Sequence, residues 1–389
     1  MNLKEKAIEL HKKWKGKLEV KSKVKIDSKE MLSLAYTPGV AQPCIEIAAD
    51  KRKVFDYTIK SNTIAVITDG SAVLGLGNIG AEASLPVMEG KCSLFKELAG
   101  INAFPIALKT QKTKEIIETI KNISPVFGAI NLEDISSPRC FEIEKELQNL
   151  GIPVMHDDQH ATAIVVLAGL ENALKVTGKK LEETKIVVNG IGAGGTGITK
   201  LLLAKKIQPK ELILVDKEGI LFEGKQGMLK HHEELAKITN PKKIQGNLEN
   251  ALIGADVFIG VSFKGILTKE MVQSMNSKAI VFALANPDPE IESEQAFEAG
   301  AELVATGRSD YPNQVNNVLA FPGVFKGALK AKATKINQEM KLAAVKALAE
   351  CVENPTKENF IPSPLEKKVA EKISEAVKKA AIGSGVVRK

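Results

Sequence analysis

Two pairs of adjacent carboxylates are the first residues in this chain that suggest chemistry. Glu133 and Asp134 stand in INLEDI, and Asp157 and Asp158 stand in VMHDDQHATA. Each pair follows an expected strand, and ligands of α/β proteins bind outside the carboxyl ends of the strands, so the two pairs can converge. Four carboxylates at one place require a cation, and oxygen ligands without a nearby cysteine favour Mg²⁺ or Mn²⁺. The competing interpretation of either pair alone is a helix N-cap.

Other polar residues near these pairs are weaker candidates when each is taken alone. His156 and His160 flank the second pair and offer nitrogen ligands. Lys91, in LPVMEGK, is one lysine among fifty, and a lysine base must first lose its proton in a desolvated or cationic site. Tyr36, in SLAYTPGVA, is by itself better explained as a packed aromatic residue.

A glycine-rich segment in the second half has the pattern of a dinucleotide-binding turn. In KIVVNGIGAGGTGITK, an expected strand runs into Gly190, Gly192 and Gly195 and then into an expected helix. These glycines permit a tight turn and let backbone N–H groups approach a pyrophosphate. Asp216 stands 21 positions after Gly195, where an acidic residue binds the ribose hydroxyls. Asp216 favours NAD over NADP, although Lys217 and Lys230 keep NADP possible.

Asparagines near the ends of expected elements are candidates for holding a substrate carboxylate. Asn286 stands in FALANPDPE, and Asn316 and Asn317 stand in QVNNVLAFPG. An asparagine side chain donates well to a carboxylate, but it also caps turns, and each position alone is better explained as a turn.

Short apolar segments alternate with helical sequence along most of the chain. The expected strands lie at residues 63–68, 102–108, 126–130, 152–155, 185–189, 211–215, 256–261 and 279–284, with a helix at 162–177 between the two sets. This alternation predicts an α/β protein with a parallel sheet, and helical sequence follows from Phe325 onward, broken by a PSP turn. We expect an N-terminal α/β domain for substrate and metal at residues 1–155. A Rossmann-like domain with a helical tail is expected at residues 156–389.

Composition excludes several classes of partner. The net charge is +7, but only four of the 54 basic residues are arginine, whereas proteins that read nucleic acids favour arginine. The charged N-terminus lacks the apolar run of a signal peptide, and the longest apolar stretch, residues 161–170, is too short to cross a bilayer. The four cysteines show no paired spacing. We expect a cytoplasmic protein without a nucleic-acid or membrane partner.

Taken together, the motifs resemble those of the malic enzyme family, in its short prokaryotic form. They occur in the family's order from about Tyr36 through the IPSP segment, and so cover most of the chain: YTPGVA, ITDGSAVLGLGNIG, LPVMEGK, INLEDI, HDDQHATA, NGIGAGGTG, ANPDPE and QVNNVLAFPG.

The resemblance implies a role for each candidate residue. Lys91 is expected to be the general base and Tyr36 the general acid, with Asp157 supporting Lys91 by a hydrogen bond. The implied metal ligands are Glu133, Asp134 and Asp158; the implied substrate contacts are Lys91, Asn286 and Asn317; and the implied cofactor contacts are Gly190, Gly192, Ala193, Gly194, Gly195, Asp216 and Asn286.

The resemblance also implies an activity, the metal-dependent oxidative decarboxylation of L-malate to pyruvate and CO₂ with NAD or NADP. A homodimer is the expected assembly, and a neighbouring subunit completing the active site remains possible. One alternative is a malolactic-type enzyme that keeps NAD bound and forms lactate. Another is an inactive nucleotide-sensing protein, which predicts loss of Tyr36, Lys91 and the acidic positions, yet all of these are present.

Overall fold

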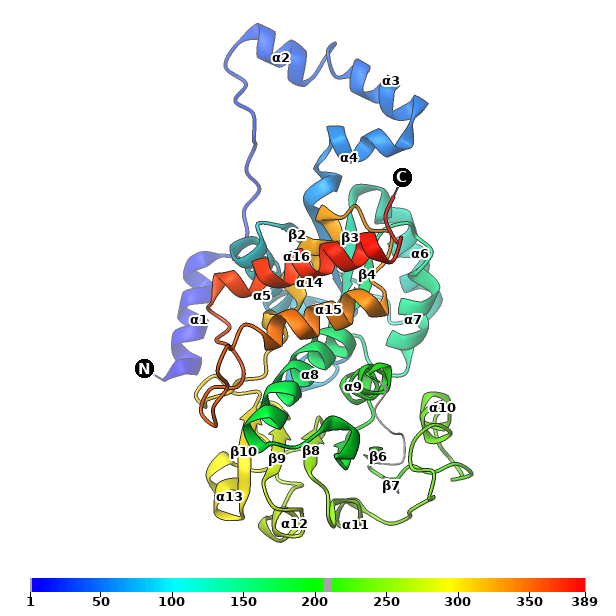
Figure 1. Ribbon diagram of the computed structural model, residues 1–389. Coiled ribbons are helices and arrows are strands. Elements are labelled where there is room, and N and C mark those ends of the chain that lie inside the picture. The colour runs from blue at the N-terminus through cyan, green and yellow to red at the C-terminus, as the bar shows by residue number, and fades with distance from the viewer. Residues whose placement is uncertain (1, 206–211, 389) are drawn as a thin grey trace.

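The computed structural model describes residues 2–205 and 212–388 and shows two parallel sheets surrounded by helices (Figure 1). The first sheet has the order β2-β1-β3-β4, and its strands are β1 Thr63–Thr68, β2 Asn102–Ala107, β3 Ala129–Leu132 and β4 Val154–His156. All its pairings are parallel. Helices α5 (Gly80–Ala99), α6 (Thr113–Ile123) and α7 (Arg139–Leu147) belong to this part. Strand β1 is wholly buried, as a sheet covered on both faces requires.

The second sheet has the order β10-β9-β8-β5-β6-β7, the strand order of a Rossmann fold. Its strands are β5 Ile186–Asn189, β6 Leu212–Asp216, β7 Gly219–Ile220, β8 Val257–Gly260, β9 Ala279–Ala283 and β10 Ala301–Thr306. The helices between them are α9 Ala193–Ala204, α10 Lys230–Ala236, α11 Leu248–Leu252, α12 Lys269–Gln273 and α13 Ser293–Glu298. The expected α/β class with a Rossmann-like sheet is therefore confirmed, except that the short edge strand β7 runs antiparallel to β6.

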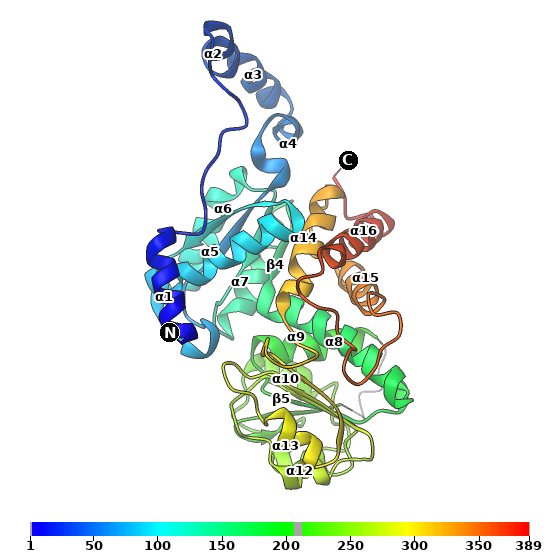
Figure 2. The same cartoon turned by 90° about the vertical axis from the view of Figure 1, so that its left-hand side faces the viewer.

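One long helix and three C-terminal helices join the two sheets. Helix α8 (Asp157–Thr177) follows β4 directly and packs against α9 and α15. Of the C-terminal helices α14 (Phe321–Lys330), α15 (Gln338–Ala349) and α16 (Lys367–Gly383), α14 and α16 contact α5 of the first sheet's layer (Figure 2). Their side chains form one continuous core, in which Phe95 of α5 lies 4.6 Å from Phe321 between ring centroids. The domain boundary proposed at residues 155 and 156 falls at the end of β4.

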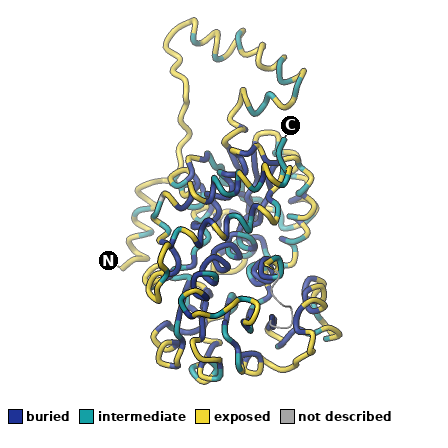
Figure 3. Tube along the Cα trace, viewed as in Figure 1, coloured by how far each residue is buried: buried dark blue, intermediate teal, exposed yellow. Residues whose placement is uncertain are grey.

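Residues 29–57, which hold helices α2 to α4, leave this body as an arm. Helix α1 (Leu3–Trp14) lies beside α5, and α2 (Lys29–Ala35), α3 (Ala41–Ala49) and α4 (Val54–Tyr57) lead away from it and back (Figures 1 and 2). No residue of these four helices is buried (Figure 3). The arm therefore has no core of its own.

Several expected element boundaries were wrong. Strand β3 begins at Ala129 rather than 126, because a 3₁₀ turn containing Pro125 occupies residues 124–126. The helix expected at 162–177 begins at Asp157, and strands β7 and β10 were not expected. The first residue of the strand expected at 211–215 lies outside the described residues.

Candidate active site

A largely buried lysine lies between two carboxylates at the carboxyl edge of the first sheet. The Nζ of Lys91, on α5, is 2.7 Å from Asp157 Oδ2 and 2.9 Å from Glu133 Oε1. It also lies 4.1 Å from the ring centroid of Phe321. Burial lowers the pKa of Lys91, but the charges of Asp157 and Glu133 outweigh burial and raise that pKa above its ordinary value. Lys91 is therefore a positively charged group held within the protein interior.

The acidic pairs converge around this lysine. One oxygen each from Glu133, Asp157 and Asp158 lies within 4.8 Å of the other two. Asp134 joins through its backbone, whose N–H donates to Asp158 Oδ2 at 3.0 Å. Burial raises the pKa of Glu133 and of Asp158, and burial together with Asp158 raises the pKa of Asp134 to about 8. Glu133, Asp134 and Asp158 therefore resist carrying their full negative charge beside the single positive charge of Lys91.

A divalent cation fits this donor set. Asp134 Oδ2 and Asp157 Oδ1 are buried and have no hydrogen-bond partner among the described residues, and buried polar atoms seldom lack one. Carboxylate oxygens are the ligands that Mg²⁺ and Mn²⁺ prefer. The three carboxylates that the geometry groups include Asp157, whereas the set inferred from the sequence has Asp134 in its place.

The helix N-cap interpretation of the acidic pairs was wrong. The N-cap of α7 is Pro138, five and four residues after Glu133 and Asp134, and the N-cap of α8 is His156. Neither cap residue makes a side-chain capping bond. Asp157 and Asp158 instead occupy the first turn of α8, where the helix dipole favours negative charge.

Asn317 reaches the cluster from the C-terminal part of the chain. Its Nδ2 donates to Asp157 Oδ2 at 2.9 Å, and its Oδ1 accepts from Thr162 Oγ1 at 2.9 Å. Asn286 lies on the loop after β9, and a Cβ added to Gly75 would stand 2.3 Å from its backbone oxygen. The loop after β1 of the first sheet therefore touches the Asn286 segment, which follows β9 of the second sheet.

The two candidate histidines have different surroundings. His160 Nε2 lies 2.8 Å from Glu144 Oε1, and His160 Nδ1 lies 3.0 Å from Lys341 Nζ. Burial lowers the pKa of His160. His156 Nε2 lies 3.5 Å from Asp158 Oδ2, and neither of its ring nitrogens forms a hydrogen bond with the described residues. Of the two rings, only that of His156 adjoins the acidic cluster.

The glycine-rich turn forms a cradle at the start of α9. Gly190 has a φ of 96°, a conformation that other residues rarely adopt. A Cβ on Gly195 would lie 2.0 Å from the oxygen of Gly190, whereas one on Gly192 would meet nothing within 4 Å. Ala193 and Gly194 begin α9, so their N–H groups lie at a helix N-terminus. This open, donor-rich turn fits a dinucleotide pyrophosphate.

Tyr36 lies far from the lysine in this chain. It follows α2 on the exposed arm, and 67% of its surface is accessible. In both views the arm points away from the body that holds α5 and β4 (Figures 1 and 2). Within a single chain, the structure does not bring Tyr36 to Lys91.

One buried carboxylate that sequence analysis missed links three strand ends beside the glycine-rich turn. Glu290 is fully buried, and its carboxylate accepts the N–H groups of Ser262 and Ala285, each at 2.9 Å. Ser262 Oγ in turn accepts from Asn189 Nδ2 at 2.7 Å. Glu290 therefore fixes the loops after β5, β8 and β9 relative to one another. In the sequence, the position of Glu290 within the ANPDPE motif was the signal that could have identified it.

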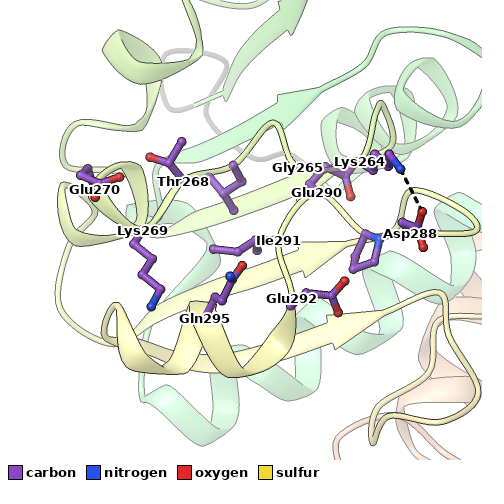
Figure 4. A pocket seen from close by; sticks show the side chains of 12 residues that line it. Lys264, Gly265, Thr268, Lys269, Glu270, Asp288, Glu290, Ile291, Glu292 and Gln295 are labelled. Atoms are coloured by element: carbon purple, nitrogen blue, oxygen red, sulfur yellow. Dashed lines mark hydrogen bonds and ion pairs between the residues drawn. The ribbon is translucent and has the colours of Figure 1, made fainter.

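A cavity of about 680 Å³ lies beside the same loops (Figure 4). Lys264 and Asp288, 3.4 Å apart, face each other at one side of it, and Thr268 and Gln295 lie farther along its wall. None of the site residues expected from the sequence lines this cavity.

Family models match both halves of the chain. The model described as malic enzyme, N-terminal domain, matches residues 15–148, and the model described as malic enzyme, NAD binding domain, matches residues 160–382.

Individual relatives are similar over nearly the whole chain. The bifunctional malic/malolactic enzyme of Bacillus subtilis is 55% identical over 100% of this chain and 95% of its own length. The NAD-dependent malic enzyme of Geobacillus stearothermophilus is 54% identical over 96% of this chain and 78% of its own. The crystal structure of the NAD-dependent malic enzyme from Thermotoga maritima superposes with a TM-score of 0.93 at 51% identity, covering 96% of this chain and 98% of that one.

Proposed function

The chain belongs to the malic enzyme family, and from this premise we propose that it oxidatively decarboxylates L-malate to pyruvate and CO₂ while reducing NAD(P). The observation that carries the proposal is the position of Lys91 between Asp157 and Glu133. This places a proton-transfer group beside a cluster suited to a divalent cation. The balance is malate and NAD⁺ giving pyruvate, CO₂ and NADH.

We propose that Glu133, Asp134 and Asp158 hold Mg²⁺ or Mn²⁺, with Asp157 next to them supporting Lys91. A bound divalent cation supplies Lewis acidity, which favours ionisation of a hydroxyl and stabilises a developing enolate. Asp134 Oδ2, which has no hydrogen-bond partner in residues 2–205 and 212–388, supports the place of Asp134 among the ligands.

In this proposal Lys91 accepts the proton of the malate C2 hydroxyl, and the C2 hydride passes to the nicotinamide. Lys91 must be neutral for that step, whereas Asp157 and Glu133 favour its charged form. Sharing these carboxylates with a cation would weaken their hold on the lysine proton. Asn317 keeps Asp157 aligned with Lys91 and, with Asn286, is the proposed contact for the substrate carboxylates.

We further propose a homodimer in which Tyr36 acts in the partner subunit's site. Protonation of C3 requires an acid after CO₂ leaves, and Tyr36 is the tyrosine that the family motif assigns to it. Its exposure, and the direction of an arm that has no buried residue, support delivery to a second copy. Exposed apolar residues on the arm, among them Leu32, Leu34 and Ile45, are suited to burial in such an interface.

NAD is the proposed cofactor, with NADP as a possible alternative. The glycine-rich turn at Gly190, Gly192 and Gly195 supports a dinucleotide, and Asp216 ends β6 where a ribose hydroxyl would bind. None of the helices in residues 2–205 and 212–388 has both the length and the apolar content of a membrane span. We propose a cytoplasmic enzyme, in keeping with the four free thiols.

A malolactic activity is the second candidate, because the Bacillus subtilis relative is named for both reactions. An inactive nucleotide-sensing protein is disfavoured, because Lys91 and the acidic residues retain contacts with one another.

The test is absorbance of the reduced nicotinamide with L-malate, Mn²⁺ and either NAD or NADP, with and without a chelator. We expect chelator-sensitive growth of NADH accompanied by pyruvate. Lactate without net NADH would instead support the malolactic reaction, and unchanged malate would refute both.

A further inference from the structure

Asp134, one of the proposed metal ligands, has an unusual backbone conformation. Its φ of 52° lies in the left-handed region, which residues other than glycine seldom adopt. Residues in such conformations persist only where the surrounding structure holds them. Here the N–H of Asp134 donates to Asp158 Oδ2 at 3.0 Å, and the backbone oxygen of Asp134 accepts from the N–H of Ala72, also at 3.0 Å. The loop after β1, which carries Ala72, therefore holds one side of this ligand.

A single buried hydroxyl joins that loop to the loop after β3, which carries Asp134. Ser71 Oγ donates to Asp69 Oδ1 at 2.5 Å and accepts from the N–H of Ser136 at 2.9 Å. The N–H of Ser71 also donates to Asp69 Oδ1, at 3.0 Å. Since Ser71 directly precedes Ala72 and Ser136 follows Asp134 by two positions, the hydroxyl bridges the two loops next to the Asp134 backbone.

Arg139, at the start of α7, fixes this bridge from the other side. Its Nη1 lies 2.9 Å from Asp69 Oδ2, as an ion pair without the geometry of a hydrogen bond, and its Nη2 donates to Ser136 Oγ at 3.0 Å. Asp69 is buried, and a buried carboxylate requires a positive partner. The charge of Asp69 is thus used on Arg139, and the three carboxylates grouped around the proposed cation site do not include it.

The other two proposed ligands have supports of their own. The N–H of Glu133 donates to the backbone oxygen of Ile67 at 2.8 Å, continuing the pairing of β3 with β1, and Glu133 Oε2 accepts from Asn131 Nδ2 at 2.8 Å. Asp158 lies in the first turn of α8. Asp134 is therefore the ligand whose position depends most on the contacts between the two loops.

We propose that Ser71 is a positioning residue for the metal site, an inference that rests on the proposed metal-dependent function. With Asp69 and Arg139, it holds the turn that keeps Asp134 beside Asp158. Without the hydroxyl, the N–H of Ser136 loses its acceptor, and the turn can relax toward a commoner backbone conformation that moves the Asp134 carboxylate. Substituting a group that orients a metal ligand typically costs about 10–100-fold in metal affinity.

The experiment is a titration of the metal-free protein with Mn²⁺, followed by electron paramagnetic resonance. The signal of free Mn²⁺ gives the dissociation constant, and the spectrum of bound Mn²⁺ depends on the ligands that hold the ion. For Ser71→Ala we expect the dissociation constant to rise about tenfold and the bound spectrum to change, because one ligand is displaced. Arg139→Lys keeps the charge that Asp69 requires but lacks the fork that also binds Ser136, so we expect a smaller rise.

Ser84→Ala is the matched control, since Ser84 is also buried and its hydroxyl donates to the backbone oxygen of Ala81 at 2.6 Å, within α5. We expect S84A to bind Mn²⁺ with the constant and the spectrum of the unaltered protein. Unchanged binding in both S71A and R139K, or an equal rise in S84A, overturns the inference. If S71A does not fold, unchanged binding in R139K alone overturns it. Failure of the unaltered protein to bind Mn²⁺ overturns the proposed metal-dependent function as well.

Discussion

Replacing Lys91 by methionine tests whether this one cation balances the acidic cluster. The substitution keeps a long unbranched side chain but leaves Glu133 and Asp157, with side chains 5% and 0% exposed, without their partner. Removing one member of a buried ion pair costs about 3–5 kcal/mol. We expect the metal-free free energy of unfolding to fall by about 3 kcal/mol, the low end of that range, because Glu133, whose pKa is already raised, takes up a proton and so limits the loss.

The loss of stability in Lys91→Met also depends on pH. A carboxyl group whose pKa is raised in the folded state is protonated at lower pH, where repulsion within the cluster disappears. The loss in Lys91→Met is therefore larger at about pH 8 than at about pH 6. Added Mn²⁺ should stabilise the variant more than the unaltered protein, because it replaces the missing positive charge.

The assay is urea unfolding with chelator or with Mn²⁺ at both pH values. Lys96→Met is the matched control, since Lys96 lies on the same helix and its Nζ contacts Asn102 Oδ1 rather than a carboxylate. Equal urea midpoints for Lys91→Met and the unaltered protein in chelator would refute the reasoning. So would an equal loss in the control.

Two further predictions concern the metal and the arm. Burial and Asp158 raise the pKa of Asp134 to about 8, so Mn²⁺ must displace protons, and its affinity should rise with pH up to that value. Calorimetric titrations at about pH 6.5 and 8.5 check this, and equal affinities contradict it. Tyr36→Phe and Lys91→Met, each inactive alone, should regain part of the activity when co-expressed if the arm serves the partner's site. No recovery in isolated mixed dimers would place Tyr36 in its own chain's site.

The order of motifs and the glycine-rich turn could be interpreted from the sequence because both depend on local chemistry. The turn needs residues without side chains at Gly190 and Gly195, and the sequence shows these directly. The acidic pairs could be placed at strand ends because apolar segments precede them. Element boundaries were less certain: Pro125 shortened one strand, and the short strand β7 pairs only at an edge.

The α/β class, the Rossmann turn and the family follow from the sequence alone, since they rest on residue types and their order. Which distant residues meet depends on the tertiary structure. Asn317 contacts Asp157, which lies 160 positions earlier in the chain. Glu290 binds the backbone that follows β8 and β9, and His232 contacts Asp216. Tyr36 lies on an exposed arm. Such contacts depend on how the packed helices and strands approach one another, and a local sequence pattern carries no information about that approach.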